Sequence, residues 1–587
     1  MQPVMSWALT KKNQELLDHE RGFRKKIWGE GLTICLAYPH FYGTGMSNLG
    51  FQTVYALLND LPFCLCERVF LPQPGDEARF RAKAIPLFSM ESRKPLNEFD
   101  FIAFSIPFEN DYPNVLKILE LGRIPLQAAH RTRTDPLCLA GGISVTLNPE
   151  PLADFVDAFL IGEGEDLIPG FFEKMKTSLE SGLDREACLE EAQRTVEGVY
   201  CPRFYPVSYT EDQTIRDMHP LKDGLPAKIK RKWVKNLDSF TTDQVITTTG
   251  TEFGDLFITE ISRGCRRGCR FCAAGFVYRP VRYRHLSTLL PSIEEGIGQG
   301  KKIGLLGTAI SDHPELPEIC RAVLDRHGSL SLSSLRIDRI TPEIAALIRE
   351  AEIDTIALAP EAGSERLREV IHKGISDRQI FEALERLLDE DILNLRLYFL
   401  IGLPTEREED IDALIRLVKR IGHHARAYTE GRKSLRRLTL SINQFIPKPQ
   451  TPFQWHPLED IQVVNKRLRK IIQALRGEPA VRILHDLPKW NYVQALLSLG
   501  DRRVGGILSA VHRLNGNWSQ ALKQVPLNAD FFVYRAKPLD EFLPWDILEG
   551  AASRTHLRAE YENALAHRDR QEKNHAGTGQ GEPYHGK

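Results

Sequence analysis

The most informative segment of the chain is Ile261-Ser-Arg-Gly-Cys-Arg-Arg-Gly-Cys-Arg-Phe-Cys-Ala-Ala-Gly275. It places cysteines at positions 265, 269 and 272, in a Cys-x3-Cys-x2-Cys array. A hydrophobic run at residues 256–261 precedes the array and is typical of a strand, whereas Gly264 and Gly268 disfavour a regular helix. The three sulfurs are therefore expected on a loop that can wrap around a bound group.

Three thiolates close together in sequence suit an iron–sulfur cluster. A structural zinc site would take four nitrogen or sulfur ligands, usually in two separated pairs, and no fourth ligand is evident near this array. The same spacing also fits one face of a helix, where cysteine is a common buried residue. The glycines and the seven arginines from Arg263 to Arg284 argue against such a helix. A cluster site is thus the favoured interpretation.

The array also carries an aromatic residue, Phe271, directly before its last cysteine. In this it resembles the signature of the radical S-adenosylmethionine (radical SAM) superfamily. The resemblance implies that Cys265, Cys269 and Cys272 hold a 4Fe–4S cluster, whose free iron chelates the amino and carboxylate groups of S-adenosylmethionine (SAM). One electron then cleaves the C5′–S bond and releases a 5′-deoxyadenosyl radical. Because no second cluster motif is visible, an external one-electron donor of the flavodoxin or ferredoxin type is expected.

The chain has 587 residues, enough for three or four domains, and 42% of them are hydrophobic. A formal net charge of −1 gives no field to steer a polyanion, so a nucleic-acid partner is not favoured. A basic run at 228–235 leaves a local RNA contact open, but such runs are more often solvated strand edges. The ten cysteines form no disulfide framework, and neither a signal peptide nor an apolar run of membrane-spanning length is evident. We therefore expect a soluble cytoplasmic protein with no membrane partner.

Residues 1–30 predict an N-terminal helical arm. Residues 31–200 alternate short hydrophobic strands with helices, which predicts parallel βαβ units in a doubly wound sheet. This layout, with Asn148-Pro-Glu-Pro-Leu-Ala-Asp-Phe155 and Ile161-Gly-Glu-Gly-Glu165, resembles the cobalamin-binding-like domain of many radical SAM enzymes. The Asp-x-His-x-x-Gly motif, whose histidine ligates cobalt, is missing. Either cobalamin binds without a protein histidine, or a Rossmann-like scaffold without cobalamin covers the radical site.

Residues 251–456 alternate strands and helices again, and the whole chain is expected to be of the α/β class. The predicted strands lie near residues 256–261, 302–307, 330–334, 353–359, 393–400 and 437–443. Six such repeats suit the partial (β/α)6 barrel of the radical SAM superfamily. Sites in barrels of this kind gather at the C-terminal ends of the strands.

Those strand ends supply the candidate SAM contacts. Arg336 follows the third strand, where a guanidinium can pair with a carboxylate in a bidentate fork, and Ser333 can bond a ribose or carboxylate oxygen. The resemblance implies that Gly307 and Thr308 offer backbone contacts to the methionine amino group, although the usual Gly-Gly-Glu triplet is absent. It also implies that Glu361, after the fourth strand, faces the nucleoside.

The segment at 399–406 is similar to the Gly-x-Ile-x-Gly-Leu-Pro type that packs on adenine, and it adds Gly402 and Leu403 to the candidates. It departs from that type at Tyr398 and Leu400, which stand where glycine and isoleucine would be. The expected cofactor contacts are Phe271, Gly307, Thr308, Ser333, Arg336, Glu361, Gly402 and Leu403. No catalytic side chain is assigned.

Four further segments complete the predicted organisation. Residues 201–250 are expected to be a linker, 457–567 a helical C-terminal extension and 568–587 a disordered tail rich in polar residues. A proline-rich segment at 445–455 predicts either a lid over the barrel or an extended connector. Together with the segments at 500–503 and 543–546, it resembles a largely uncharacterised radical SAM family that brings no settled substrate.

Several functions remain open within this interpretation. One is cobalamin-dependent methyl transfer. Another is a methylthiotransferase acting on tRNA or a ribosomal protein, a group with a second cluster on three N-terminal cysteines. Cys35, Cys64, Cys66 and Cys138 fall in or beside predicted buried strands, which speaks against that second cluster. A non-catalytic iron–sulfur regulatory protein is a different class, but it would not need the strand-end contacts. A zinc-binding module is a weaker third option.

Overall fold

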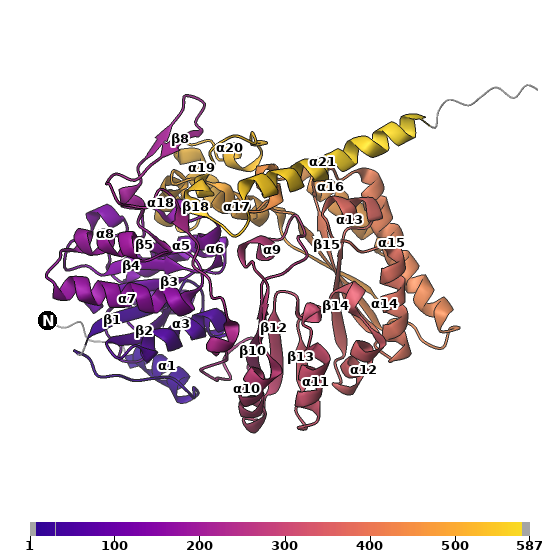
Figure 1. Ribbon diagram of the computed structural model, residues 1–587, viewed down its shortest axis with the longest axis horizontal. Helices are drawn as coiled ribbons and strands as arrows, with labels where there is room; N and C mark the ends of the chain where they lie inside the picture. Colours follow the sequence, from indigo (N-terminus) through magenta and orange to yellow (C-terminus); the bar gives the residue numbers. More distant parts are fainter. Residues whose placement is uncertain (1–6, 30, 578–587) are drawn as a thin grey trace, which may run out of the picture.

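The computed structural model describes the backbone of residues 7–29 and 31–577, with side chains up to residue 566. An N-terminal domain and a barrel lie side by side, and C-terminal helices cover one end of both (Figure 1). One hydrophobic core lies in the barrel, and a second runs without a break through the N-terminal domain and the C-terminal extension. The extension therefore packs as part of the N-terminal domain's core.

The N-terminal domain is built on a six-stranded sheet in the order β2-β1-β3-β4-β5-β6, and its pairs are parallel except for the last. The strands are β1 (Leu32–Tyr38), β2 (Cys64–Phe70), β3 (Phe101–Ser105), β4 (Leu137–Gly141), β5 (Ala158–Leu160) and β6 (Val199–Tyr200). Helices α3 (Leu49–Asp60) and α7 (Gly164–Glu180) contact each other. The predicted doubly wound sheet is confirmed. Its strand order reverses between β1 and β3, the point at which such sheets bind ligands.

The barrel consists of two four-stranded sheets, β11-β10-β12-β13 and β14-β15-β16-β17, joined by a bridge between Leu335 and Leu358. The strands are β10 (Leu256–Arg263), β11 (Arg282–Tyr283), β12 (Lys302–Gly307), β13 (Leu330–Leu332), β14 (Thr355–Glu361), β15 (Asn394–Ile401), β16 (Arg437–Gln444) and β17 (Val481–His485). The connecting helices are α10 (Leu286–Gly298), α11 (Leu316–Leu324), α12 (Pro342–Glu350), α13 (Glu365–Val370), α14 (Asp377–Asp389), α15 (Glu408–Tyr428) and α16 (Ile461–Leu475). The six predicted strands are present and parallel, as an open barrel requires.

Two predictions at the ends of the barrel and the chain were wrong. Residues 481–485 were expected to be helical but form β17, which pairs with β16 after the α16 crossover, because Val481 and Ile483 meet an open sheet edge. The disordered tail was expected over residues 568–587, but residues 568–577 continue helix α21 (Arg554–Gly577). The rest of that segment, 578–587, lies outside the described residues. The predicted N-terminal arm contains α1 (Trp7–Asp18).

The segment predicted to be a linker, 201–250, is structured. It contains the hairpin of β7 (Val207–Tyr209) and β8 (Ile215–Met218), and β9 (Ile229–Lys230), which pairs with β18 (Leu548–Glu549). Its basic run was interpreted as a solvated strand edge, but Arg231 is buried against the N-terminal domain. Ion pairing from distant residues explains the difference, since the local sequence does not contain the partner.

The C-terminal extension holds the N-terminal domain and the barrel together. It comprises α17 (Pro488–Leu499), α18 (Val504–Arg513), α19 (Trp518–Gln524), α20 (Asp530–Val533) and α21. The Asn148 side-chain amide donates to the carbonyls of Ser498 and Gly500 at 2.9 and 2.8 Å. The proline-rich segment is a packed connector, because Trp455 is fully buried and Lys448 pairs with Glu109 at 2.7 Å. Among the described helices, none is long and apolar enough to span a bilayer.

Candidate active site

The three cysteines lie in the loop between β10 and α9 (Ala274–Val277), here called the cysteine loop (residues 264–273). The loop starts at Gly264, whose φ is 86° and where an added Cβ would meet the Tyr278 carbonyl oxygen at 2.3 Å. Only glycine fits there without displacing the backbone. The Cys272 amide donates to the Cys269 carbonyl at 3.0 Å and closes a tight turn between these two thiols. The predicted loop is therefore present.

The thiols of the loop influence one another and lie in a cationic environment. Burial raises the pKa of the Cys269 thiol, and the charges of Lys373 and Arg336 oppose that shift. Burial and the neighbouring Cys269 raise the pKa of Cys272 to about 11. Iron binding would replace these thiol protons, and the nearby cations would offset the charge of a thiolate-bound cluster.

Among the residues that the structure describes, no three His, Cys, Asp or Glu side chains converge on the position of a single metal ion. A cubane makes a different demand, because each cysteine binds a different iron and the sulfurs spread around the cluster. Three free thiols on one loop, together with surrounding positive charge, fit that demand.

The predicted residues of the third and fourth strand ends meet beside Cys269. Glu361 accepts from the Lys373 ammonium at 3.1 Å, and its backbone is in the left-handed region, at a φ of 68°. Arg336 donates through Nε to Asp338 at 2.9 Å, so its guanidinium is already engaged by a carboxylate. The charges of Arg336, Lys373 and Glu361 all act on the Cys269 thiol. The structure therefore brings two predicted contacts, Arg336 and Glu361, to the cysteine loop.

Five buried serine hydroxyls have no hydrogen-bond partner among the described residues, and two of them lie at strand ends of the barrel. One belongs to Ser333, a predicted SAM contact. The other belongs to Ser262, which is 2% exposed and lies just before the cysteine loop. An added Cβ on Gly307 would approach the Ser262 Oγ to 2.4 Å, so this glycine leaves room beside the hydroxyl. An unpaired buried hydroxyl is costly, and a ligand oxygen or nitrogen would satisfy it.

The remaining predicted contacts divide into two groups. Thr308 is exposed at the end of β12, and Phe271 is half-buried against the hydrophobic core that the N-terminal domain shares with the C-terminal extension. Gly402 and Leu403 are engaged elsewhere: the Gly402 amide donates to Glu406 at 2.6 Å, and the Leu403 side chain is buried in the hydrophobic core. The adenine contact predicted for these two residues stays a prediction.

A cavity of about 710 Å³, here called the interdomain pocket, reaches from the barrel into the N-terminal domain. Its barrel wall contains Ser262, Cys272, Leu306, Gly307 and Thr308. Its floor in the N-terminal domain is formed by the turns after β3, β4 and β5, where Ser105, Gly141, Gly142, Gly162 and Gly164 lie. The C-terminal strand ends of the two domains thus face a single space.

The interdomain pocket continues past these turns into the N-terminal domain, as an apolar slot between its sheet and helices α3 and α7. The slot is lined by Leu36, Val54, Leu57, Ala103, Leu139, Leu160, Leu167, Ile168 and Phe172. Neither a charged residue nor a histidine belongs to this lining. The cavity therefore combines a mouth with glycine backbone and a deep apolar arm, which suits a large ligand with an apolar extension.

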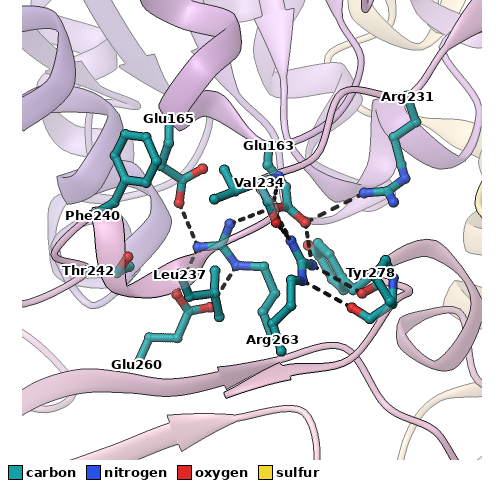
Figure 2. A network of polar contacts seen from close by, with 12 residues as sticks. Glu163, Glu165, Arg231, Val234, Leu237, Phe240, Thr242, Glu260, Arg263 and Tyr278 are labelled. Atoms are coloured by element: carbon teal, nitrogen blue, oxygen red, sulfur yellow. Dashed lines mark hydrogen bonds and ion pairs between the residues drawn. The ribbon is translucent and has the colours of Figure 1, made fainter. Parts of the chain in front are cut away.

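Where the pocket passes from one domain to the other, its wall is a buried polar network centred on Glu163 (Figure 2). Arg282 donates two hydrogen bonds to Glu163 at 2.8 Å, Arg263 donates one at 3.0 Å, and the Val234 amide donates another at 3.0 Å. Arg231 lies 3.5 Å away. Burial alone would raise the pKa of Glu163, but these hydrogen bonds and charges hold it below its usual range.

Arg263 extends the network toward the cysteine loop. It also pairs with Glu165 and Glu260, both at 2.7 Å (Figure 2). Because Arg263 is the last residue of β10 and Glu163 precedes α7, the network fixes the start of the cysteine loop relative to the N-terminal domain.

Sequence reasoning missed Ser262, Lys373 and Glu163. Glu163 stands in a glycine-rich turn, and none of its arginine partners lies nearby in the sequence. Lys373 follows α13, where a lysine is ordinarily interpreted as a C-terminal helix charge. The only available signal for Ser262 was its position two residues before the cysteine loop on the strand that leads into it.

Comparisons with known proteins agree with this architecture. A family model described as the radical SAM superfamily matches residues 259–418, and one described as the N-terminal region of radical SAM proteins matches residues 50–202. An uncharacterised protein of Methanocaldococcus jannaschii is 28% identical over 477 residues, which are 81% of this chain and 90% of that protein.

More distant similarities are partial in sequence or in shape. A ribosomal protein uS12 methylthiotransferase of a Thermotoga species is 25% identical over 176 residues, 28% of this chain and 41% of that protein. Among solved structures, the radical SAM methyltransferase TsrM from Kitasatospora setae, with tryptophan substrate and a SAM analogue bound, has a TM-score of 0.49 at 12% identity. That alignment covers 91% of this chain and 99% of TsrM.

Proposed function

We propose, from the premise that this chain belongs to the radical SAM superfamily, that Cys265, Cys269 and Cys272 hold its 4Fe–4S cluster and that the interdomain pocket receives a second large ligand beside SAM. The chain is a radical SAM enzyme, so a cluster and SAM are required. The observation that carries the proposal is the continuous cavity from Cys272 and Gly307 to the strand ends of the N-terminal domain.

The residues around the cysteine loop have separate roles in this proposal. The cluster, when bound, supplies the electron that cleaves SAM. Lys373 and Arg336 offset the negative charge that the thiolates bring. The barrel strand ends carry the unpaired hydroxyls of Ser262 and Ser333 and the carboxylate of Glu361. These three groups can orient the polar groups of SAM.

We propose that the second ligand is a cobalamin and that the reaction is a methyl transfer to a substrate of still open chemistry. When bound, cobalamin supplies a carrier for the methyl group. The turns that carry Gly141, Gly142 and Gly162 line the pocket with backbone, against which a broad ring system can lie, and the apolar slot suits an aromatic base on a flexible arm. Because no histidine is among the lining residues, such binding would use shape and backbone contacts without a protein ligand to cobalt.

A methylthiotransferase is the alternative, and the N-terminal cysteines weigh against it. Cys35, Cys64, Cys66 and Cys138 are buried in the strands of the N-terminal sheet, away from the strand-end turns that face the pocket. Burial raises the pKa of the Cys64 and Cys138 thiols to about 12. We therefore propose a single cluster that is reduced by an external flavodoxin- or ferredoxin-type donor.

The test is reductive SAM cleavage in the absence of oxygen. The purified chain is reconstituted with iron and sulfide, reduced with dithionite, given SAM and assayed for 5′-deoxyadenosine and for S-adenosylhomocysteine, with and without added cobalamin. We expect 5′-deoxyadenosine from the wild type and none from Cys269→Ala. Cys320→Ala is the matched control, because Cys320 is a buried free thiol of α11 outside the loop.

The two parts of the proposal fail in different ways. A fully loaded, reducible cluster that yields neither product would overturn the radical SAM chemistry proposed for this loop. Cleavage of SAM without any binding of cobalamin by the same protein would leave the cluster assignment in place and reject cobalamin as the second ligand.

A further inference from the structure

The cysteine loop is covered by an element that lies outside both matched family regions. Helix α21 runs across the end of the barrel where α9 and α13 lie (Figure 1), and it contacts α13 directly. The superfamily match ends at residue 418, whereas α21 begins at Arg554. The chain therefore returns to the cysteine loop after the rest of the barrel is complete.

Helix α21 contacts the cysteine loop through an ion pair with Arg270, a residue of the cysteine array itself. Arg270, which stands between Cys269 and Cys272, is 5% exposed and donates through Nε to the Glu560 carboxylate of α21 at 2.9 Å. Its Nη1 donates to the Val370 carbonyl at 2.8 Å, and its backbone amide donates to the Ile371 carbonyl at 3.0 Å. The residue between two cluster cysteines is thus held on one side by α13 and on the other by α21.

The face of α21 that carries Glu560 is firmly seated. Tyr561 is buried against the rings of Trp455 and Phe453, at centroid distances of 5.8 and 6.4 Å. Its hydroxyl lies 3.2 Å from the His456 Nδ1. His556, one turn earlier, contacts the ring of Phe276 in α9 at 6.4 Å. These contacts hold this part of α21 in place without support from the ion pair.

We propose that Glu560 is a positioning residue for the 4Fe–4S cluster, and that α21 is a strap which holds Cys269 and Cys272 at their binding separation through Arg270. This inference rests on the proposed cluster at the cysteine loop. Without the carboxylate, the buried guanidinium of Arg270 keeps its charge but loses its only acidic partner among the described residues. The turn between the two cysteines then relaxes and releases iron more easily.

The experiment measures iron loss in the full chain. Wild type, Glu560→Gln and Glu560→Asp are reconstituted anaerobically, exposed to an iron chelator and followed by visible absorbance, and their reduced clusters are compared by electron paramagnetic resonance. We expect Glu560→Gln to lose iron about tenfold faster than wild type, the scale on which groups that orient metal ligands act. Its resonance spectrum should also change, and Glu560→Asp should restore part of the wild-type behaviour.

Glu562→Gln is the matched control, because Glu562 lies on the same helix and, among the described side chains, pairs with the exposed Arg558 alone, at 2.9 Å. Equal iron release from wild type and Glu560→Gln would overturn the inference, as would an equal acceleration in Glu562→Gln. Should Glu560→Gln fold poorly, Arg270→Gln is compared with the double variant. Iron loss in the double variant that is no faster than in Arg270→Gln supports the strap. Additive acceleration of iron loss rejects it. A wild type that assembles no cluster at all would instead reject the proposed function.

Discussion

The two surfaces that face each other across the interdomain pocket are both C-terminal edges of parallel strands, yet they offer opposite chemistry. The barrel edge carries three thiols, two unpaired hydroxyls and a set of cations, and Cys272 and Ser262 are the members that line the pocket. The edge of the N-terminal domain presents glycine backbone above an apolar slot. The first can hold a group by covalent bonds and charge, and the second can hold one only by shape.

The difference shows how one fold class serves two binding modes. In both domains the turns that follow the strands lie at the C-terminal edge of the sheet, so the topology sets the position of the binding site. What is bound there depends on the residues that line each edge. The Glu163 network, between the two edges, is the device that sets their separation.

Removal of the Glu163 carboxylate from this network should change the stability of the protein more than any other substitution considered below. Glu163→Gln should lower the free energy of unfolding by about 3 kcal/mol, because it leaves the buried guanidiniums of Arg263 and Arg282 without their shared carboxylate. Thermal unfolding followed by circular dichroism measures the change. Glu197→Gln is the control, since Glu197 is half exposed and lies 3.9 Å from the Lys232 ammonium. Equal midpoints for the two variants would mean that the surfaces are positioned independently of each other.

A smaller effect is expected from filling the slot. Ala103→Leu adds bulk to a residue of β3 that lines the slot, so it should weaken cobalamin binding about tenfold by overpacking. Cluster iron content should stay at the wild-type value. Equilibrium dialysis of cobalamin measures the affinity, with Ala103→Ser as the variant that keeps the volume small. Unchanged affinity in Ala103→Leu would exclude the slot as part of the binding site.

The smallest expected effect concerns one hydroxyl of the barrel edge. Ser262→Ala should weaken SAM binding to the reconstituted protein about threefold, which corresponds to one modest hydrogen bond. Calorimetric titration with SAM measures it, and Ser334→Ala, at an exposed position, is the control. A loss of cobalamin affinity in Ser262→Ala with normal SAM binding would instead assign this hydroxyl to the N-terminal side of the pocket.

Much of the fold could be predicted because its signals are local. The spacing of Cys265, Cys269 and Cys272 and the glycines beside them are enough to indicate a binding loop. The alternation of buried strands with amphipathic helices is enough to indicate two parallel sheets. The short β17 was missed because five residues with partly exposed side chains give little periodicity.

The polar part of the site was less predictable, because its partners are distant in sequence. Arg231 is buried only because Glu163, some 70 residues earlier, comes to lie beside it. The Ser262 hydroxyl has room beside it because Gly307 on the neighbouring strand has no side chain. Neither relation leaves a trace in the local sequence. The cap of α13 is local by contrast, because the Ser364 hydroxyl accepts from the Leu367 amide three residues later, at 3.1 Å.

The pairing of β9 with β18 joins residues that are about 320 positions apart, and the Arg270–Glu560 contact spans nearly as many. During synthesis the N-terminal domain and the barrel leave the ribosome long before the residues that complete them. The nascent cysteine loop therefore stays uncovered for the time needed to translate about half of the chain. Loading of iron and sulfide has its widest access in that interval, before α21 closes over the loop.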